Sequence, residues 1–226
     1  MSKLVLLLAL AQLPTTVPVG EEPLVDVEPL HPAFRLDIRY ATKDNFAKVK
    51  AYPVAKCLLR ASVAKKMVKA QRWLDKNHPG TYLIFKDCYR PNDVQAVLWN
   101  AVKNTKMRRY VANPHTKTGS IHSYGAAVDL TLGRKGQGEL AMGTPYDFLG
   151  KLAEPRHEQK YLASGQLTKK HIKNRKLLRR LMTKVVGLRM IRNEWWHFNL
   201  DTAKKIRKRF TRLNVPLTSA AKPLKR

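Results

Sequence analysis

The chain has 226 residues, of which 44% are hydrophobic and 27% are charged. This length and composition are enough to bury one full core, and the sequence contains no internal repeat, which argues against a solenoid. Lysine and arginine outnumber aspartate and glutamate by 44 to 16, which gives a net charge of +28.

The amino-terminal segment carries a short apolar run. Lys3 is followed by apolar residues at positions 4–10, which are too few to span a bilayer. Ala9-Leu10-Ala11 offers a small-x-small cleavage site, so residues 1–11 are predicted to be a signal peptide, with an ordinary chain start as the alternative. We therefore expect a periplasmic or secreted protein, and otherwise a cytoplasmic one. Residues 12–32, rich in proline, valine and glutamate, predict a linker or an extended arm over the domain.

Three helices are predicted from the spacing of apolar residues. The first covers residues 57–76 and is followed by the helix-ending sequence His78-Pro79-Gly80. The second covers residues 92–103 and the third residues 170–186. The side chains expected to face the core are Leu58, Leu59, Val63, Met67, Ala70 and Leu74 in the first helix, Val94, Val97, Leu98 and Val102 in the second, and Leu177, Leu178, Leu181, Val185 and Val186 in the third.

Two strands are predicted at residues 81–85 and 126–132, where β-branched, aromatic and small residues follow one another. The strands are too few and too hairpin-like for a doubly wound sheet. The expected fold class is α+β: a single domain over residues 33–200, with a small antiparallel sheet that carries a metal site and helices packed against it. Residues 201–226 are expected to form a basic C-terminal tail.

Two short segments contain the residue types of a catalytic metal site. The first supplies His122 and Asp129, and the second supplies Glu194 and His197. Either segment alone is a weak signal, because a single histidine or aspartate more often caps or hydrogen-bonds. Together, two imidazoles and one carboxylate would leave the fourth position of a tetrahedral zinc free for water, as in catalytic sites. We therefore predict one Zn2+ per chain on His122, Asp129 and His197, with Glu194 transferring protons.

Arg90 is a third candidate. It follows the predicted strand at 81–85 and precedes the predicted helix at 92–103. A guanidinium at such a turn can be directed into a cleft, where it would stabilise an oxyanion or bind a substrate carboxylate. Taken alone, Arg90 would be one surface charge among many, so its assignment depends on the neighbouring motifs.

The two cysteines, Cys57 and Cys88, are 31 residues apart. One disulfide between them would require an oxidising compartment, and two inert buried thiols are the alternative. Neither cysteine belongs to a paired-cysteine motif, so we do not assign them to the metal.

The ordered set of motifs resembles the zinc D-alanyl-D-alanine dipeptidase family, which includes relatives of the vancomycin-resistance dipeptidase. The resemblance covers about residues 37–199, and although each motif is modest, their order is specific. The segments that carry it are Asp37-Ile-Arg-Tyr40-Ala-Thr-Lys-Asp44-Asn45-Phe46, Asp87-Cys-Tyr-Arg90-Pro, Ser120 to Leu132, Met142 to Phe148, Asn174 to Leu178 and Glu194-Trp-Trp-His-Phe198.

This resemblance implies zinc-dependent hydrolysis of a small D,D-dipeptide, D-alanyl-D-alanine, in cell-wall peptide metabolism or glycopeptide resistance. It implies zinc binding by the three ligands already predicted and a general-base role for the glutamate. The remaining roles that it implies are oxyanion stabilisation by Arg90, contact with the substrate carboxylate by Ser120, and contact with the free amino end by Tyr40 and Asp147.

Related D,D-carboxypeptidases and murein endopeptidases, which act on peptidoglycan peptides, provide an alternative function. They share the zinc-ligand pattern, but they typically have proline at the position of Trp195. The Tyr-Ala-Thr-x-Asp-Asn-Phe segment that begins at Tyr40 is also not expected in them. The sequence therefore favours a dipeptidase.

A dipeptidase function does not explain the positive charge. After residue 150 there are 22 basic and 4 acidic residues, and residues 204–212 are the densest stretch. A nucleic-acid-binding protein is thus the alternative from another class. No nucleic-acid motif accompanies the run, and aromatic residues are not interleaved with it. An anionic envelope polymer bound through the basic C-terminal third is the partner we expect, with a solvated basic face as the alternative.

Overall fold

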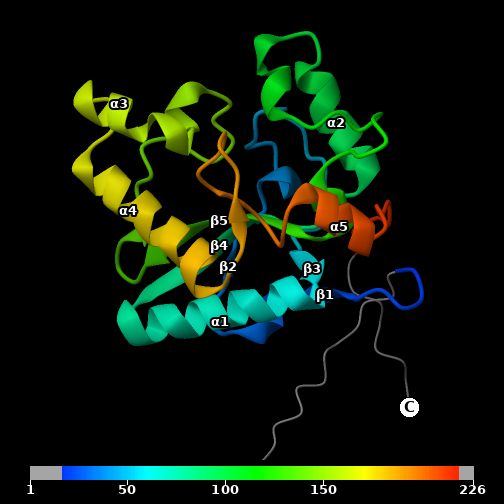
Figure 1. Ribbon diagram of the computed structural model, residues 1–226, viewed down its shortest axis with the longest axis horizontal. Coiled ribbons are helices and arrows are strands. Elements are labelled where there is room, and N and C mark those ends of the chain that lie inside the picture. The colour runs from blue at the N-terminus through cyan, green and yellow to red at the C-terminus, as the bar shows by residue number, and fades with distance from the viewer. Residues whose placement is uncertain (1–16, 219–226) are drawn as a thin grey trace, which may run out of the picture.

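A computed structural model of the chain describes residues 17–218. Its centre is a six-stranded sheet with the strand order β2-β4-β5-β8-β7, and β6 pairs with β5 off this path (Figure 1). Strands β1 and β3 form a separate two-stranded sheet. The strands are β1 (Leu24–Asp26), β2 (Arg35–Leu36), β3 (Leu58–Arg60), β4 (Thr81–Asp87), β5 (Ala127–Arg134), β6 (Gly138–Glu139), β7 (Arg189–Met190) and β8 (His197–Asn199).

The central strands β4, β5 and β8 are antiparallel, as expected. Strand β2 is different, because it runs parallel to β4. The sheet is therefore mixed, and the expectation of a purely antiparallel sheet is wrong at this edge. A parallel neighbour requires a long crossover, and the segment between β2 and β4, which contains a long helix, supplies it.

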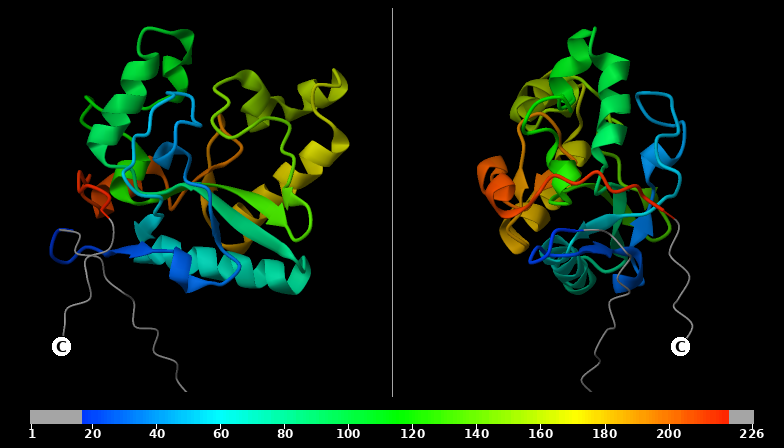
Figure 2. Two further views of the ribbon diagram at one scale, coloured as in Figure 1. Left: turned by 180° about the vertical axis from the view of Figure 1, so that it is seen from behind. Right: turned by 90° about the vertical axis from the view of Figure 1, so that its right-hand side faces the viewer.

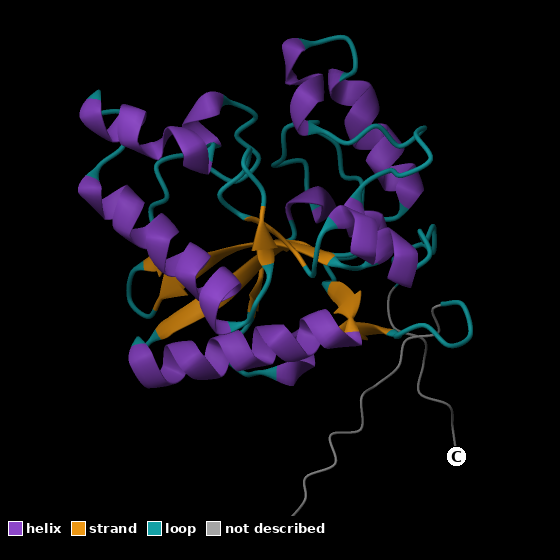
Figure 3. Cartoon of the chain, in the orientation of Figure 1, coloured by secondary structure: helices purple, strands orange, loops and turns teal. Residues whose placement is uncertain are grey.

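Five α-helices surround the sheet in the described part of the chain, which confirms the α+β class (Figure 3). Helix α1 runs across one side of the sheet, α3 and α4 lie at one flank, and α2 and α5 lie at the other (Figures 1 and 2). The α-helices are α1 (Ala61–Asn77), α2 (Asn92–Val102), α3 (Glu158–Ala163), α4 (Lys169–Arg180) and α5 (Ala203–Arg209). The short 3-10 helices are η1 (Glu28–Leu30), η2 (Arg39–Ala41), η3 (Lys106–Tyr110), η4 (Ile121–Tyr124), η5 (Lys151–Ala153) and η6 (Pro155–His157).

The second and third predicted helices are confirmed as α2 and α4, and α4 continues into a π-helical turn, η7 (Leu181–Val185). The prediction that Val97 faces the core is wrong, because its side chain is 45% exposed. The buried face of α2 is formed by Gln95, Leu98 and Val102 instead. The first predicted helix begins at Ala61, four residues later than expected. The residues before it pair with β1 instead, and a short apolar run does not by itself distinguish strand from helix.

The segment expected to be a linker belongs to the domain from β1 onward. Leu24 and Val27 are buried in the core, and β1 pairs with β3 along its length. The preceding Glu21 accepts hydrogen bonds from Arg60 and from the backbone of Thr211. Of the two expectations for residues 12–32, the described part therefore fits the arm packed on the domain and contradicts the free linker.

The expected basic tail also contributes to the core. Ile206 and Phe210 are buried and pack against Tyr124 of η4. Further on, Leu213 and Leu217 are buried in the main core. The packed domain therefore extends beyond the predicted limits of 33–200. The sequence did not indicate this, because the many basic residues conceal the apolar ones between them.

No helix in the described range 17–218 is both long and apolar enough to cross a membrane. The predicted signal peptide, residues 1–11, lies outside the described residues.

Cys57 and Cys88 form a disulfide with a Cα–Cα distance of 5.1 Å. Cys57 precedes β3, and Cys88 directly follows β4. Both cysteines are buried. The bond therefore ties the small β1–β3 sheet to the end of the strand that precedes Arg90.

Reduction of this disulfide is expected to lower the free energy of unfolding by about 3 kcal/mol, because closing a loop of this length restricts the unfolded chain. Urea unfolding of the oxidised and reduced forms would measure the difference. The double variant Cys57→Ser, Cys88→Ser serves as the control, since reductant should leave its unfolding midpoint unchanged. Equal midpoints for the oxidised and reduced parent would contradict the prediction.

Candidate active site

Three neighbouring strands bring acidic and imidazole side chains together at one end of the sheet. Asp87 of β4 pairs with Asp129 of β5, and Asp129 pairs with His197 of β8. His122 approaches from η4, which directly precedes β5. Gly125 permits this approach: its φ is +67°, and a Cβ there would lie 2.4 Å from the side chain of Leu24.

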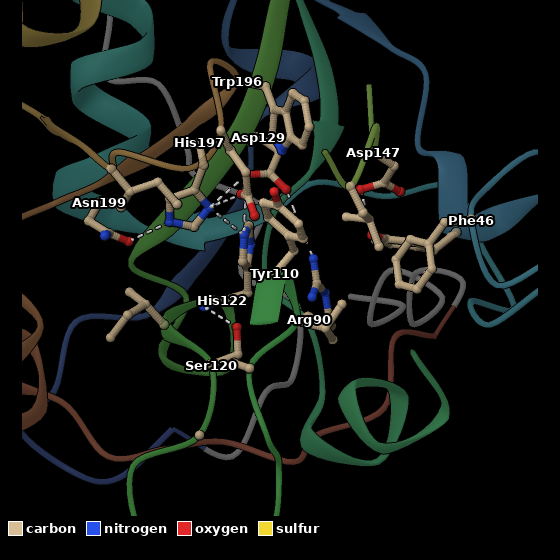
Figure 4. A pocket seen from close by; sticks show the side chains of 18 of the residues that line it. Phe46, Arg90, Tyr110, Ser120, His122, Asp129, Asp147, Trp196, His197 and Asn199 are labelled. Carbon is tan, nitrogen blue, oxygen red and sulfur yellow. Dashed lines mark hydrogen bonds and ion pairs between the residues drawn. The ribbon is translucent and has the colours of Figure 1, made fainter. Parts of the chain in front are cut away.

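The nitrogen and oxygen atoms of His122, Asp129 and His197 form a compact triangle (Figure 4). His122 Nε2 lies 3.1 Å from His197 Nδ1 and 3.3 Å from Asp129 Oδ1. His197 Nδ1 lies 2.9 Å from Asp129 Oδ1. Two ligand atoms on a tetrahedral zinc at 2.0–2.1 Å are separated by about 3.3 Å. The three donors are therefore spaced as one zinc ion requires.

The two histidines are held in defined orientations. His122 Nδ1 lies 2.7 Å from the carbonyl oxygen of Cys88, to which it can donate. His197 Nε2 lies 2.9 Å from Oδ1 of Asn199 and can donate to it. These contacts leave Nε2 of His122 and Nδ1 of His197 as acceptors that face the triangle, a common arrangement for histidines that bind metals. Tyr146 donates to Asp129 Oδ2 at 3.0 Å and so orients the third ligand.

Glu194 lies beside the triangle. Its Oε2 is 3.9 Å from His197 Nδ1, and its side chain is only 13% exposed. Burial raises the pKa of Glu194 to about 8, although the nearby His197 acts to lower it. A bound divalent cation would favour the ionised carboxylate. Glu194 can therefore hold or release a proton close to neutral pH.

Arg90 lies over the ring of Tyr40 and is fixed by two polar partners. Its Nε and one terminal nitrogen donate to Asp87 Oδ2 at 2.9 and 2.5 Å, and the other terminal nitrogen donates to Gln95 Oε1 at 2.7 Å. Tyr52 donates to the second oxygen of Asp87 at 2.7 Å. A guanidinium has five N–H donors. The contacts with Asp87 and Gln95 use three of them, so two remain for a ligand in the cavity.

Asp147 lies on the side of the cavity away from Asn199 (Figure 4), and Tyr40 contacts it there. The Tyr40 hydroxyl donates to Asp147 Oδ1 at 3.1 Å, while Asp147 Oδ2 is buried and has no hydrogen-bond partner in the described part of the chain. Burial, together with the carboxylate of Asp129, raises the pKa of Asp147 to about 8. Asp147 also has a φ of +62°, a conformation uncommon outside glycine and found at functional sites. An ammonium ion would satisfy this carboxylate.

A single cavity of about 270 Å³ joins these groups. All eight residues predicted from the sequence line it: Tyr40, Arg90, Ser120, His122, Asp129, Asp147, Glu194 and His197. Ser120 lies at the start of η4, where its Oγ accepts from the backbone N–H of His122 at 3.3 Å. The structure thus brings together every site residue that the motifs indicated.

Several residues of the site were not predicted. The period of two in a strand places Asn199 on the same face as His197, so that residue could have been found from the sequence. Asp87 belongs to the same motif as Arg90, but its contact with Arg90, the contact of Gln95 with Arg90 and that of Tyr52 with Asp87 depend on the fold. Arg207 of α5 also lines the cavity, although the sequence placed it in a tail remote from the motifs.

The family model described as D-ala-D-ala dipeptidase matches residues 20–216 of the chain. The chain belongs to the D-Ala-D-Ala dipeptidase family. The match includes the arm at β1 and the segment containing α5, which agrees with their packing in the core.

Two curated relatives in the family are equally similar to the chain. The D-alanyl-D-alanine dipeptidase of Escherichia coli is 32% identical over 180 residues, which are 80% of this chain and 86% of the relative. That of Enterococcus faecalis is 32% identical over 189 residues, 76% of this chain and 88% of the relative. The alignments therefore span most of both proteins.

A solved structure of a variant of the vancomycin-resistance D,D-pentapeptidase VanY with Zn(II) shares 16% identity with the chain. The structural alignment covers 66% of this chain and 78% of the VanY chain, with a TM-score of 0.30. At that score the two structures do not define a common site.

Proposed function

We propose that the protein is a zinc-dependent dipeptidase that hydrolyses D-alanyl-D-alanine. The observation that carries the proposal is the donor triangle of His122, Asp129 and His197, spaced for zinc and placed in one cavity with Glu194 and Arg90. Membership of a family described as D-Ala-D-Ala dipeptidases supplies the substrate. The proposal includes one Zn2+ per chain.

When bound, zinc would polarise the scissile carbonyl and lower the pKa of a water ligand. Glu194 accepts the proton of the attacking water and delivers it to the leaving amine. Its position beside His197 and its limited exposure suit this transfer, because the carboxylate has few competing solvent contacts. Arg90, fixed by Asp87 and Gln95, directs its remaining donors to the negative charge that develops on the carbonyl oxygen.

The pair Tyr40 and Asp147 would bind the free amino group of the substrate. Asp147 Oδ2 is buried without a partner, and an unpaired buried acceptor has a substantial free-energy cost. A substrate ammonium would provide the missing donor and the opposite charge. An amino group extended by further residues would leave Asp147 unpaired, so this contact favours a dipeptide over a longer peptide.

Acetylation of the amino end of D-Ala-D-Ala is therefore expected to abolish cleavage, and Asp147→Asn is expected to raise KM by roughly 10-fold or more with a smaller change in kcat. Zinc-loaded protein would be incubated with D-Ala-D-Ala, L-Ala-L-Ala and the acetylated dipeptide, with free alanine as the readout. An exposed acid outside the cavity provides the control Asp44→Asn, which should retain the parent KM. Efficient trimming of a peptidoglycan pentapeptide would instead support a D,D-carboxypeptidase.

We further propose that the protein acts outside the cytoplasm. The Cys57–Cys88 disulfide supports this location, because such bonds persist mainly in oxidising compartments. Intact-mass measurement of protein from its native host, with and without reductant before alkylation, tests it. An uncleaved Met1 together with two freely alkylated thiols would place the enzyme in the cytoplasm and leave its catalytic assignment unchanged.

An anionic envelope polymer is proposed as the partner of the basic surface. Helix α4 supports this proposal because it presents a row of exposed cations, Lys169, Lys170, Lys173, Lys176 and Arg180. Such a surface would concentrate the enzyme near polyanions in a salt-dependent manner. The test compares the salt-sensitive retention of the protein on a teichoic-type polymer with its retention on DNA of equal charge. A clear preference for DNA would favour the nucleic-acid alternative.

A further inference from the structure

Arg207 has no role in the mechanism described above, yet it lines the same cavity as the predicted zinc ligands. It lies on α5, whose neighbouring residue Ile206 is buried against Tyr124. Tyr124 belongs to η4, the element that also carries Ser120 as its N-cap and His122. The packing of α5 on η4 therefore holds Arg207 in the wall of the cavity that Ser120 and His122 also line.

The guanidinium of Arg207 has no protein partner among residues 17–218. Its Nε is inaccessible to solvent and makes no hydrogen bond, and no carboxylate of the described chain forms an ion pair with it. Two other cations of α5 are paired: Lys205 with Asp201, and Arg209 with Glu22. A buried donor without an acceptor is costly, so an anionic ligand in the cavity would satisfy Arg207.

Asp147 and Arg207 give the cavity one incompletely paired group of each charge sign among the described residues. Asp147 Oδ2 is also buried without a partner. Asp147 and Phe46 lie on one side of the zinc-ligand triangle, and Asn199 lies on the other (Figure 4). A free dipeptide carries one ammonium and one carboxylate, which match the unpartnered carboxylate oxygen of Asp147 and the guanidinium of Arg207.

We propose that Arg207 binds the C-terminal carboxylate of the dipeptide substrate. This inference rests on the proposed dipeptidase function and adds a determinant of substrate specificity to it. Ser120 alone would offer the carboxylate a single neutral hydroxyl. Arg207 adds a permanently charged fork whose N–H groups match the two carboxylate oxygens. The enzyme thereby recognises both ends of the dipeptide, which restricts hydrolysis to the free dipeptide.

The test compares Arg207→Met and Arg207→Lys with the control Lys208→Met, an exposed neighbour that does not line the cavity. For D-Ala-D-Ala, we expect Arg207→Met to raise KM roughly 10- to 100-fold with much less change in kcat. Arg207→Lys should recover part of the loss because it restores the charge without the fork. Lys208→Met should behave as the parent.

Direct binding provides the second readout. Kd is measured by calorimetry for D-Ala-D-Ala and its C-terminal amide, using zinc-loaded Glu194→Gln protein with and without Arg207→Met. If Arg207 binds the carboxylate, the preference for the acid over the amide should fall roughly 10-fold or more, and amide binding should hardly change. A merely structural role would weaken the binding of both ligands equally.

An unchanged acid-to-amide preference in the Arg207→Met protein would overturn the assignment, even if the parent hydrolyses D-Ala-D-Ala. The proposed function would then stand without Arg207. If the zinc-loaded parent releases no alanine from D-Ala-D-Ala, the proposed function fails, and the role of Arg207 fails with it. The two failures are therefore distinguished by the activity of the parent.

Discussion

Replacement of Glu194 by glutamine is expected to reduce kcat for D-Ala-D-Ala by about 10²-fold or more while the protein retains about one zinc per chain. Glutamine keeps the size and polarity of the side chain but cannot accept a proton. Glu194 is not a member of the donor triangle, so metal binding should survive the change. Steady-state kinetics with released alanine as the readout, together with zinc analysis of the same preparation, measure both quantities.

The matched control for this variant is Glu28→Gln, which changes an exposed glutamate outside the cavity in the same way. It should have the kcat of the parent. A Glu194→Gln protein as active as the parent would move the general base to another group. A variant that loses both zinc and activity would instead show that Glu194 supports the metal site.

Substitution of any one of the three proposed zinc ligands is expected to remove both the metal and the activity. His122→Ala, Asp129→Ala and His197→Ala should each lose most of their zinc, because a site with three protein ligands has none to spare. Hydrolysis should fall below about 1% of the parent rate, since zinc supplies both the polarisation of the carbonyl and the activation of water. Zinc content after dialysis and the rate of alanine release are the measurements.

His115→Ala provides the control for the ligand series, because His115 is exposed and lies outside the donor triangle. It should retain zinc and activity. Full zinc occupancy in all three ligand variants would contradict the assignment of the metal site. Circular dichroism of each variant separates loss of the metal from loss of the fold, since Asp129 and His197 also belong to adjacent strands.

The disulfide and the metal site are connected through Cys88. The carbonyl oxygen of Cys88 accepts from His122 Nδ1, while its sulfur is bonded to Cys57. Two residues later, the backbone N–H of Arg90 donates a hydrogen bond to the carbonyl oxygen of His122. The disulfide therefore stabilises the end of β4 next to His122 and Arg90, the proposed zinc ligand and the proposed oxyanion-binding group.

The sequence by itself determined which residue types the proposed site contains. His122, Asp129, Glu194 and His197 have side chains whose reactions are independent of the fold, and their motifs occur in a specific order. It also predicted helices α2 and α4, because burial on one face imposes a period of about 3.6 residues that can be counted in a single chain. The central strands β4 and β5 are buried almost throughout and were predicted from their β-branched, aromatic and small residues.

The tertiary structure alone decided which distant residues complete the site. Strand register placed Asp87 beside Asp129, and the pairing of β3 with β1 shortened the first helix from its amino end. The docking of α5 on η4 brought Arg207 to the cavity from a segment whose charge predicted an unattached tail. Register and docking depend on contacts between residues that are far apart in the chain. Local periodicity carries no information about such contacts, so only the packed core fixes these residues in place.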